Sequence, residues 1–132
     1  MKKSAVLNDQ LSLLISQLGH TDTMAIADCG LPIPEATKRI DLSVTFGIPS
    51  FLSVLRTVLS DLSVEQAILA EEMKTVSPGL WEETKKALGT TPIQYVSHEE
   101  LKKMLPSCKG VVRTGECTSF ANIILVSTVK FS

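Results

Sequence analysis

The sequence predicts an α/β fold, organised as a single three-layer domain in which helices flank a mainly parallel central sheet. Short apolar runs alternate along the chain with segments whose apolar residues recur at helical spacing, and this alternation is typical of parallel sheets. The 132 residues suit one domain, residues 1–132, that is large enough to bury a core. With 44% hydrophobic and 20% charged residues, the composition is that of a globular protein rather than a disordered one.

The first expected element is a helix over about residues 8–18, where apolar residues recur at helical spacing. Asn8 or Ser4 can cap its start, and Gly19 is a fitting stop because glycine commonly ends helices. The short apolar run 24–27 then predicts a buried strand.

A second strand and the strongest helical stripe of the chain follow. Residues 39–44 alternate polar and apolar side chains, as a strand or a strand edge does. Residues 51–62 carry the stripe, and Ser50 directly before them suits an N-cap. The apolar run 67–70 predicts the next buried strand.

The second half of the chain repeats this alternation. A helix is expected to begin at Pro78, with Ser77 as its cap, and to end at Gly89. Residues 93–96 are the next expected strand, and residues 97–100 fit the capping-box pattern that opens a helix.

Two strands, over residues 111–113 and 121–126, are expected to close the chain. A turn around Gly115 connects them. The sequence contains no internal repeat, low-complexity tract or linker, which agrees with one domain.

The charge balance and the scarcity of aromatic residues argue against several classes of partner. The formal net charge is −1, which gives no electrostatic case for nucleic acid or an anionic membrane. Aromatic residues make up only 5% of the chain, too few for a base-stacking platform. No stretch approaches the roughly 18 apolar residues of a membrane span, and polar residues near the start interrupt any signal peptide. We therefore expect a soluble, intracellular protein with no nucleic acid or membrane partner.

The cysteines favour reduced thiols over a disulfide or metal framework. Cys29, Cys108 and Cys117 are odd in number, and a chain of this length needs no cross-link to fold. No Cys-x-x-Cys pair occurs, so small buried side chains are favoured over a zinc site that the cysteines would form with His20 and His98. Gly-rich phosphate motifs are missing as well. The sequence gives no case for a metal or a cofactor.

His20 and Asp28 flank the first expected strand, and each allows two interpretations. His20 can act as a general acid or base near neutral pH, or it can cap the first helix, whose dipole favours a positive charge there. Asp28 lies at the carboxyl end of the strand, where open sheets bind ligands, or it forms an Asx turn toward Gly30. Spacing alone leaves both questions open.

His98 and Lys102 belong to the helix that follows residues 93–96. A helix N-terminus disfavours the imidazolium form, which suits a neutral histidine that hydrogen-bonds hydroxyl groups. On spacing alone, an exposed surface histidine is the favoured interpretation, and Lys102 is a solvated lysine on the same helical face.

Several segments of the sequence resemble one enzyme family. They include Leu18-Gly19-His20-Thr21-Asp22-Thr23, Asp28-x-Gly30-Leu31-Pro32-Ile33-Pro34, Arg39-Ile40-Asp41-Leu42 and Arg113-Thr114-Gly115-Glu116-Cys117. Shorter matches lie at residues 1–8, 49–51, 70–72, 98–99 and 121–125. Together they run from end to end in unbroken register, and they resemble the D-ribose pyranase family, with L-fucose mutarotases as its relatives.

The resemblance implies an isomerase that interconverts the β-pyranose and β-furanose forms of D-ribose without a cofactor or a metal. It also implies a cytoplasmic enzyme whose ligand is a free monosaccharide delivered by a ribose transporter. The family forms ring-shaped homo-oligomers, described as a homodecamer of two pentamers, with sites near subunit boundaries.

The resemblance also implies roles for individual residues. His20 matches the catalytic histidine that donates a proton, and Asp28 and His98 match the carboxylate and imidazole that bind the sugar. Lys102 falls where the family often has a basic residue close to the site.

Phe120, Ala121 and Asn122 stand where the family has a Tyr-Ala-Asn run that contacts the sugar, Ala121 through its backbone. Phe120 keeps the ring but lacks the phenolic hydroxyl. The lost hydrogen bond is worth roughly 0.5–1.5 kcal/mol, so we expect weakened turnover or an altered sugar preference. The alternatives are a mutarotase for L-fucose or another free sugar, a non-catalytic sugar-binding protein, and a purely structural ring protein.

Overall fold

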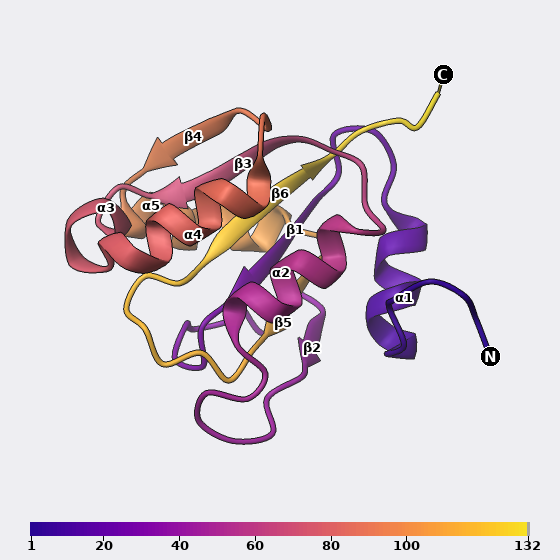
Figure 1. Cartoon of the computed structure of the whole chain (residues 1–132), viewed down its shortest axis with the longest axis horizontal. Coiled ribbons are helices and arrows are strands. Elements are labelled where there is room, and N and C mark those ends of the chain that lie inside the picture. Colours follow the sequence, from indigo (N-terminus) through magenta and orange to yellow (C-terminus); the bar gives the residue numbers. More distant parts are fainter. Residues whose placement is uncertain (132) are drawn as a thin grey trace.

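Six strands form one sheet in the computed structural model, which describes residues 1–131 (Figure 1). The strands are β1 (Thr23–Ala27), β2 (Arg39–Asp41), β3 (Val64–Ala70), β4 (Ile93–Val96), β5 (Gly110–Arg113) and β6 (Ile123–Ser127). They lie in the order β2-β5-β1-β6-β3-β4. Only β6 runs antiparallel to its neighbours, β1 and β3, so the predicted mainly parallel sheet is confirmed.

Helices cover both faces of this sheet, as the three-layer prediction requires. They are α1 (Asp9–Gln17), α2 (Phe51–Leu59), α3 (Met73–Val76), α4 (Pro78–Leu88), α5 (His98–Met104) and the 3-10 helix η1 (Leu105–Ser107). Helices α1 to α4 contribute to the core on one face, and α5 and η1 contribute to the core on the other. Figure 1 shows α2 and α4 in front of the sheet and α5 behind it.

Strand β1 shows how the sequence produces this three-layer arrangement. Met24 and Ile26 face the core under α1 and α2, whereas Ala25 and Ala27 face the core under α5. All four residues are buried. A strand covered on both faces reads as a continuous apolar run instead of an alternating one, which is the pattern that predicted it.

Three of the four predicted helix caps have the expected chemistry. The side chains of Asn8, Ser50 and Ser97 each accept a hydrogen bond from the backbone N–H three residues on, at 2.9, 3.1 and 3.1 Å. Ser77 occupies the predicted N-cap position before Pro78, but its side chain does not cap the helix, because its hydroxyl donates to the Ser119 carbonyl at 2.7 Å. Ser77 directly follows α3, and its backbone (φ −131°, ψ 58°) lies outside the extended conformation of a capping residue.

The boundaries of several elements differ from the prediction by up to three residues. Helix α2 ends at Leu59 although the apolar stripe continues to Leu62, and β2 ends at Asp41 although the alternation continues to Val44. Helix α1 ends at Gln17, and Leu18 is its C-cap, directly before Gly19. Leu62 continues the apolar pattern beyond α2 because it is buried in the core, whereas Val44, beyond β2, is exposed. None of the helices within residues 1–131 is long and apolar enough to cross a membrane.

Candidate functional site

Polar side chains from three strand ends meet at one edge of the sheet. β1 leads directly into Asp28, and β4 leads into His98 at the start of α5. Because β6 runs in the opposite direction, its first residue pairs with residues near the ends of β1 and β3. Asn122, which precedes β6, therefore lies at the same edge as Asp28. In open sheets this edge, at the carboxyl ends of the parallel strands, is where ligands bind.

A cavity of about 290 Å³ opens at this edge. Its lining residues are Asp28, Gly30, Leu31, Pro32, His98, Ser119 and Phe120. The volume is at the lower limit for ligand pockets, which suits a small polar ligand. A larger cavity of about 380 Å³ between α1, α2 and the segment after β2 is lined by no titratable side chain, so the smaller one is the candidate site.

Asp28 is held by hydrogen bonds on both carboxylate oxygens. Oδ1 accepts the N–H of Gly30 at 3.0 Å, which is the Asx turn considered above. Oδ2 accepts from Nδ2 of Asn122 at 3.1 Å. A carboxylate has about four lone-pair positions, so two remain for a ligand in the cavity. Asp28 is thus a turn residue that also lines the cavity, and ligand binding by its carboxylate stays a prediction.

Asn122 acts on Asp28 from the first turn before β6. Its Oδ1 accepts the backbone N–H of Asp28 at 2.9 Å, while its Nδ2 donates to the Asp28 carboxylate. The side chain is buried, and it does not line the cavity. Both ends of the amide are therefore used to hold Asp28, a positioning role that the sequence did not indicate.

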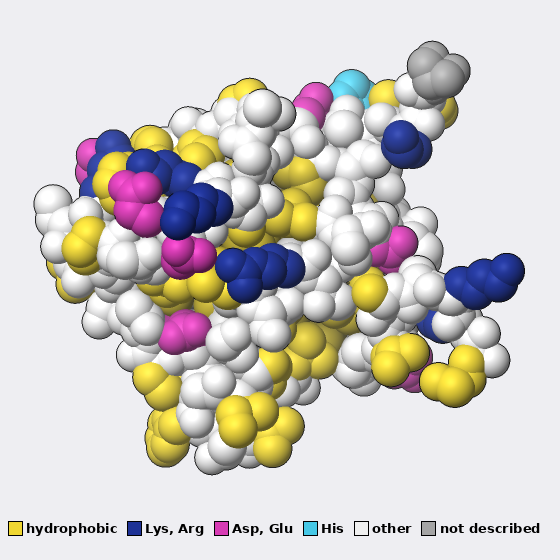
Figure 2. Space-filling model, viewed as in Figure 1, with side chains coloured by type: hydrophobic (Ala, Val, Ile, Leu, Met, Phe, Trp, Pro, Cys, Tyr) yellow, Lys and Arg dark blue, Asp and Glu magenta, His cyan; other side chains and the backbone are white. Residues whose placement is uncertain are grey.

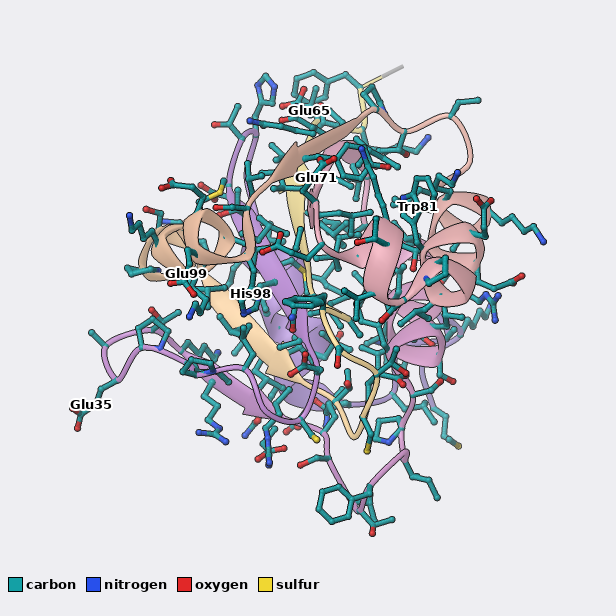
Figure 3. The ribbon with its side chains drawn as sticks, turned by 90° about the vertical axis from the view of Figure 1, so that its left-hand side faces the viewer. Glu35, Glu65, Glu71, Trp81, His98 and Glu99 are labelled. Atoms are coloured by element: carbon teal, nitrogen blue, oxygen red, sulfur yellow. The ribbon has the colours of Figure 1, made fainter. Side chains whose placement is uncertain are left out.

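His98 and Phe120 form another part of the cavity wall. Their rings meet edge to face, with centroids 5.0 Å apart and planes at 76°. Phe120 has φ of 62°, a left-handed conformation that costs free energy in residues other than glycine and often marks functional sites. The Nδ1 atom of His98 is buried and has no hydrogen-bond partner within residues 1–131. Figure 3 shows His98 toward the middle of the molecule, with Glu99 on its outer side.

His98 is also fixed through its backbone by a residue that sequence reasoning missed. Its N–H donates to both carboxylate oxygens of Glu72, at 3.0 and 3.1 Å. Glu72 follows the carboxyl end of β3, the same kind of position that singled out Asp28. Ser119 lines the cavity too, without any sequence signal of its own, and so does Pro32 from the family-like segment 28–34.

His20 lies at the other end of the sheet. Thr21, next to it, donates its N–H to the Ser127 carbonyl at the end of β6, at 2.9 Å. The five residues of β1 separate this end from Asp28 by about 16 Å. The ring Nε2 is 3.5 Å from Oε2 of Glu65, and Figure 3 shows Glu65 well separated from His98. One chain thus does not bring His20 to the cavity.

Lys102 does not line the cavity either. Its ammonium is 2.8 Å from Oε1 of Glu99, one turn earlier on α5. The hydrogen bond from Lys102 lowers the pKa of Glu99 below its ordinary value. The arrangement is that of a partly exposed ion pair on a helix surface.

The loop between β5 and β6 carries Ser119 and Phe120, and Glu116 anchors it. Its carboxylate accepts the backbone N–H of Phe51 at 2.9 Å and the hydroxyl of Thr118 at 2.7 Å. Burial alone raises the pKa of Glu116, but these hydrogen bonds outweigh it and leave the pKa below its ordinary value of 4.5. The ionised carboxylate therefore ties the loop to the start of α2.

The three cysteines are free thiols, as predicted. Burial, and after it the nearby Cys117 thiol, raises the pKa of Cys29, so this thiol is a poor nucleophile. In the described part of the chain, no group of three or more His, Cys, Asp and Glu side chains could hold a metal ion.

Comparisons with known proteins agree on one family. The model of the RbsD / FucU transport protein family matches residues 1–130. The chain is 55% identical to the D-ribose pyranase of Clostridium botulinum (strain Eklund 17B / Type B), over 99% of this chain and 100% of that protein. It is 54% identical to the D-ribose pyranase of Geobacillus thermodenitrificans (strain NG80-2), over the full length of both.

Solved structures give the same answer. The structure of Bacillus subtilis RbsD complexed with D-ribose matches with a TM-score of 0.96 at 39% identity, covering 99% of this chain and 100% of that one. The fucose mutarotase of Streptococcus pneumoniae in complex with L-fucose matches with a TM-score of 0.83 at 22% identity, again covering 99% and 100%. The second likeness shows a shared fold.

Proposed function

The chain belongs to the RbsD / FucU transport protein family, and we propose that it is an isomerase that interconverts the β-pyranose and β-furanose forms of D-ribose. The observation that carries this proposal is the cavity with a fixed carboxylate and an imidazole, in a chain more than half identical to D-ribose pyranases. A carboxylate binds sugar hydroxyls well because charge-assisted hydrogen bonds are strong.

The reaction breaks one C–O bond and forms another, and the catalyst has to supply only proton transfers. The pyranose opens when the bond between C1 and the ring oxygen breaks, the anomeric hydroxyl loses a proton and the ring oxygen gains one. The open aldehyde rotates, and the 4-hydroxyl then adds to C1 in place of the 5-hydroxyl, with the reverse proton movements. In this mechanism Asp28 and His98 hold hydroxyl groups so that the reacting atoms stay close. Ala121 offers backbone groups, and Asn122 acts through Asp28.

His20 is the proposed proton donor to the ring oxygen, a role that requires a pKa near the working pH. Since His20 and Asp28 lie at opposite ends of β1, we assign the donor to His20 of a neighbouring copy of the chain. A ring-shaped homo-oligomer, such as two paired pentamers, would bring the two ends together repeatedly. Lys102 would take part only after its ion pair with Glu99 opens.

An exposed apolar surface supports association of copies. Figure 2 shows hydrophobic side chains gathered at the foot of the molecule, over the segment between β2 and α2. The exposed residues there include Val44, Phe46 and Ile48. Contiguous apolar surface of this kind commonly marks a contact between proteins. A cytoplasmic location and a free monosaccharide as ligand complete the proposal.

Phe120 favours one alternative, a sugar-binding protein without turnover. The edge-to-face contact with His98 keeps the wall of the cavity in place, but no hydroxyl is available at this position. If the missing hydroxyl relays a proton, ribose would bind and exchange would be slow. Phe120→Tyr would then accelerate exchange strongly.

Saturation-transfer NMR on D-ribose at equilibrium tests the proposed function directly. We expect faster pyranose–furanose exchange when the protein is added, and little effect in a parallel sample of L-fucose. Acceleration for fucose alone would point to a fucose mutarotase. Ribose binding without acceleration, together with recovery on Phe120→Tyr, would establish the sugar-binding alternative.

A further inference from the structure

We propose that Glu72 is a positioning residue that holds His98 at the wall of the sugar cavity, an inference that rests on the proposed function. Glu72 lies at the end of β3, outside the residues that line the cavity. Glu72 would affect the reaction indirectly, because it fixes the position of the His98 imidazole.

The contact between Glu72 and His98 is direct and two-fold. Both oxygens of the half-buried carboxylate face the backbone N–H of His98, at 3.0 and 3.1 Å. Hydrogen bonds to an ionised acceptor are roughly twice as strong as those between neutral groups. The Glu72 side chain makes no other hydrogen bond or ion pair within residues 1–131, so this contact accounts for its whole polar environment.

Strand pairing dictates that these two residues meet. Ala70 pairs with Val96 in the parallel β3–β4 ladder, and the N–H of Glu71 extends the ladder to the Val96 carbonyl at 2.7 Å. The two chains therefore leave the sheet side by side, and Glu72 reaches the first residue of α5. Ser97 caps a later N–H of the same helix, which leaves the His98 N–H for the carboxylate.

His98 needs such support because its ring makes few polar contacts. The buried Nδ1 has no hydrogen-bond partner among the described residues. An unpaired buried nitrogen costs free energy, which favours movements of the ring that give the nitrogen a partner. The ring rests on Phe120, whose own backbone is in a left-handed conformation. Fixing the backbone at the start of α5 keeps the imidazole in the cavity wall.

Glu71 offers a matched control. It is the neighbouring glutamate, exposed, and its carboxylate pairs with Lys74 at 3.0 Å on the outer surface. Glu71→Gln makes the same chemical change as Glu72→Gln, without touching His98. A general effect of losing one negative charge would appear in both variants.

The test compares wild type with Glu72→Ala, Glu72→Gln and Glu71→Gln. Ribose affinity comes from NMR titration, turnover from saturation transfer at saturating ribose, and the local contact from the backbone amide resonance of His98. We expect Glu72→Ala to weaken ribose binding by roughly tenfold and to reduce the saturated exchange rate by a smaller factor. Glu72→Gln, which keeps one acceptor oxygen, should recover part of the affinity, and the His98 amide proton should move upfield in both Glu72 variants.

Unchanged ribose affinity in the Glu72 variants would overturn the inference, and so would an equal loss in Glu71→Gln. If Glu72→Ala fails to fold, the ribose affinity, the exchange rate and the His98 amide resonance of Glu72→Gln test the inference instead. The proposed function fails separately, if wild-type protein binds ribose but does not accelerate exchange. In that case the ribose affinities and the His98 amide resonance would still test the role of Glu72.

Discussion

At the scale of single residues, the candidate site consists of groups that touch the cavity and groups that hold them. Asp28 and His98 line the cavity, whereas Asn122 hydrogen-bonds to Asp28 and Glu72 hydrogen-bonds to His98. A side-chain amide can do this for Asp28 because it carries a donor and an acceptor at once. It meets the acceptor-only carboxylate with its NH2 and the donor-only N–H with its oxygen.

Asn122→Asp is expected to disrupt the site, since it places a second carboxylate against Asp28 in a buried position. Ribose affinity should fall at least about tenfold, and the melting temperature should drop, as measured by NMR titration and thermal unfolding. Asn8→Asp is the matched control, because aspartate is as good an N-cap as asparagine. Equal ribose affinities and melting temperatures in the two variants would contradict the proposed role of Asn122 in holding Asp28.

Glu116 makes the stability of the protein depend on acid pH. Its pKa in the folded state lies below 4.5, so its ionised form contributes stability above about pH 4.5, and that contribution is lost as the pH falls through the folded pKa. Glu116→Gln should destabilise the protein at neutral pH, and its difference from wild type should shrink in acid. Urea unfolding between pH 7 and pH 3 would measure this.

Glu35→Gln serves as the control for that experiment. Glu35 is exposed, and its side chain projects from the surface in Figure 3. A pH-independent difference between Glu116→Gln and wild type would show that the carboxylate does not act through its charge.

At the scale of secondary-structure elements, the reversed direction of β6 decides where the site lies. Its neighbours β1 and β3 run parallel to each other on either side of it. The loop before β6 therefore arrives at the edge where β1, β3 and β4 end. The apolar run predicted the strand itself but not its direction, because a fully buried strand has the same sequence pattern whether it runs parallel or antiparallel to its neighbours.

The segment after β2 is locked against the loop after β5 by Gly115. A Cβ atom on Gly115 would overlap the carbonyl oxygens of Thr45 and Ile48. Gly115→Ala should cost about 1–3 kcal/mol of the free energy of unfolding, or more, because backbone cannot yield as a flexible side chain can. Denaturant unfolding would measure the loss.

Gly79→Ala is the matched substitution. Gly79 lies in the first turn of α4, and a Cβ there has no neighbour within 4 Å. It should be neutral or stabilise the protein by up to about 1 kcal/mol, because alanine favours helix over glycine. Similar losses at both positions would refute the steric explanation for Gly115.

At the scale of the whole molecule, the two ends of β1 carry different parts of the proposed reaction. Mixing His20→Ala with Asp28→Asn tests whether sites are shared between copies. Each variant alone should be inactive, and His20→Ala should still bind ribose. In randomly mixed oligomers, about one quarter of the shared sites would carry both intact residues, so ribose exchange should reappear.

The control mixture combines Asp28→Asn with His98→Ala, two changes within the cavity of one chain. No activity should return there. Absence of recovery in verified mixed oligomers of the first pair, or full activity of His20→Ala alone, would refute the proposed role of His20.

The sequence by itself determined the alternation of elements, the buried strands, three helix caps and the family. These depend on local periodicity and on end-to-end similarity, which a chain carries in one dimension. Only the tertiary structure decided that Asn122 clamps Asp28, that Glu72 holds His98 and that His20 lies at the far end of the sheet. Those contacts join residues 94 and 26 positions apart, and strand order and direction, which no local pattern encodes, bring them together.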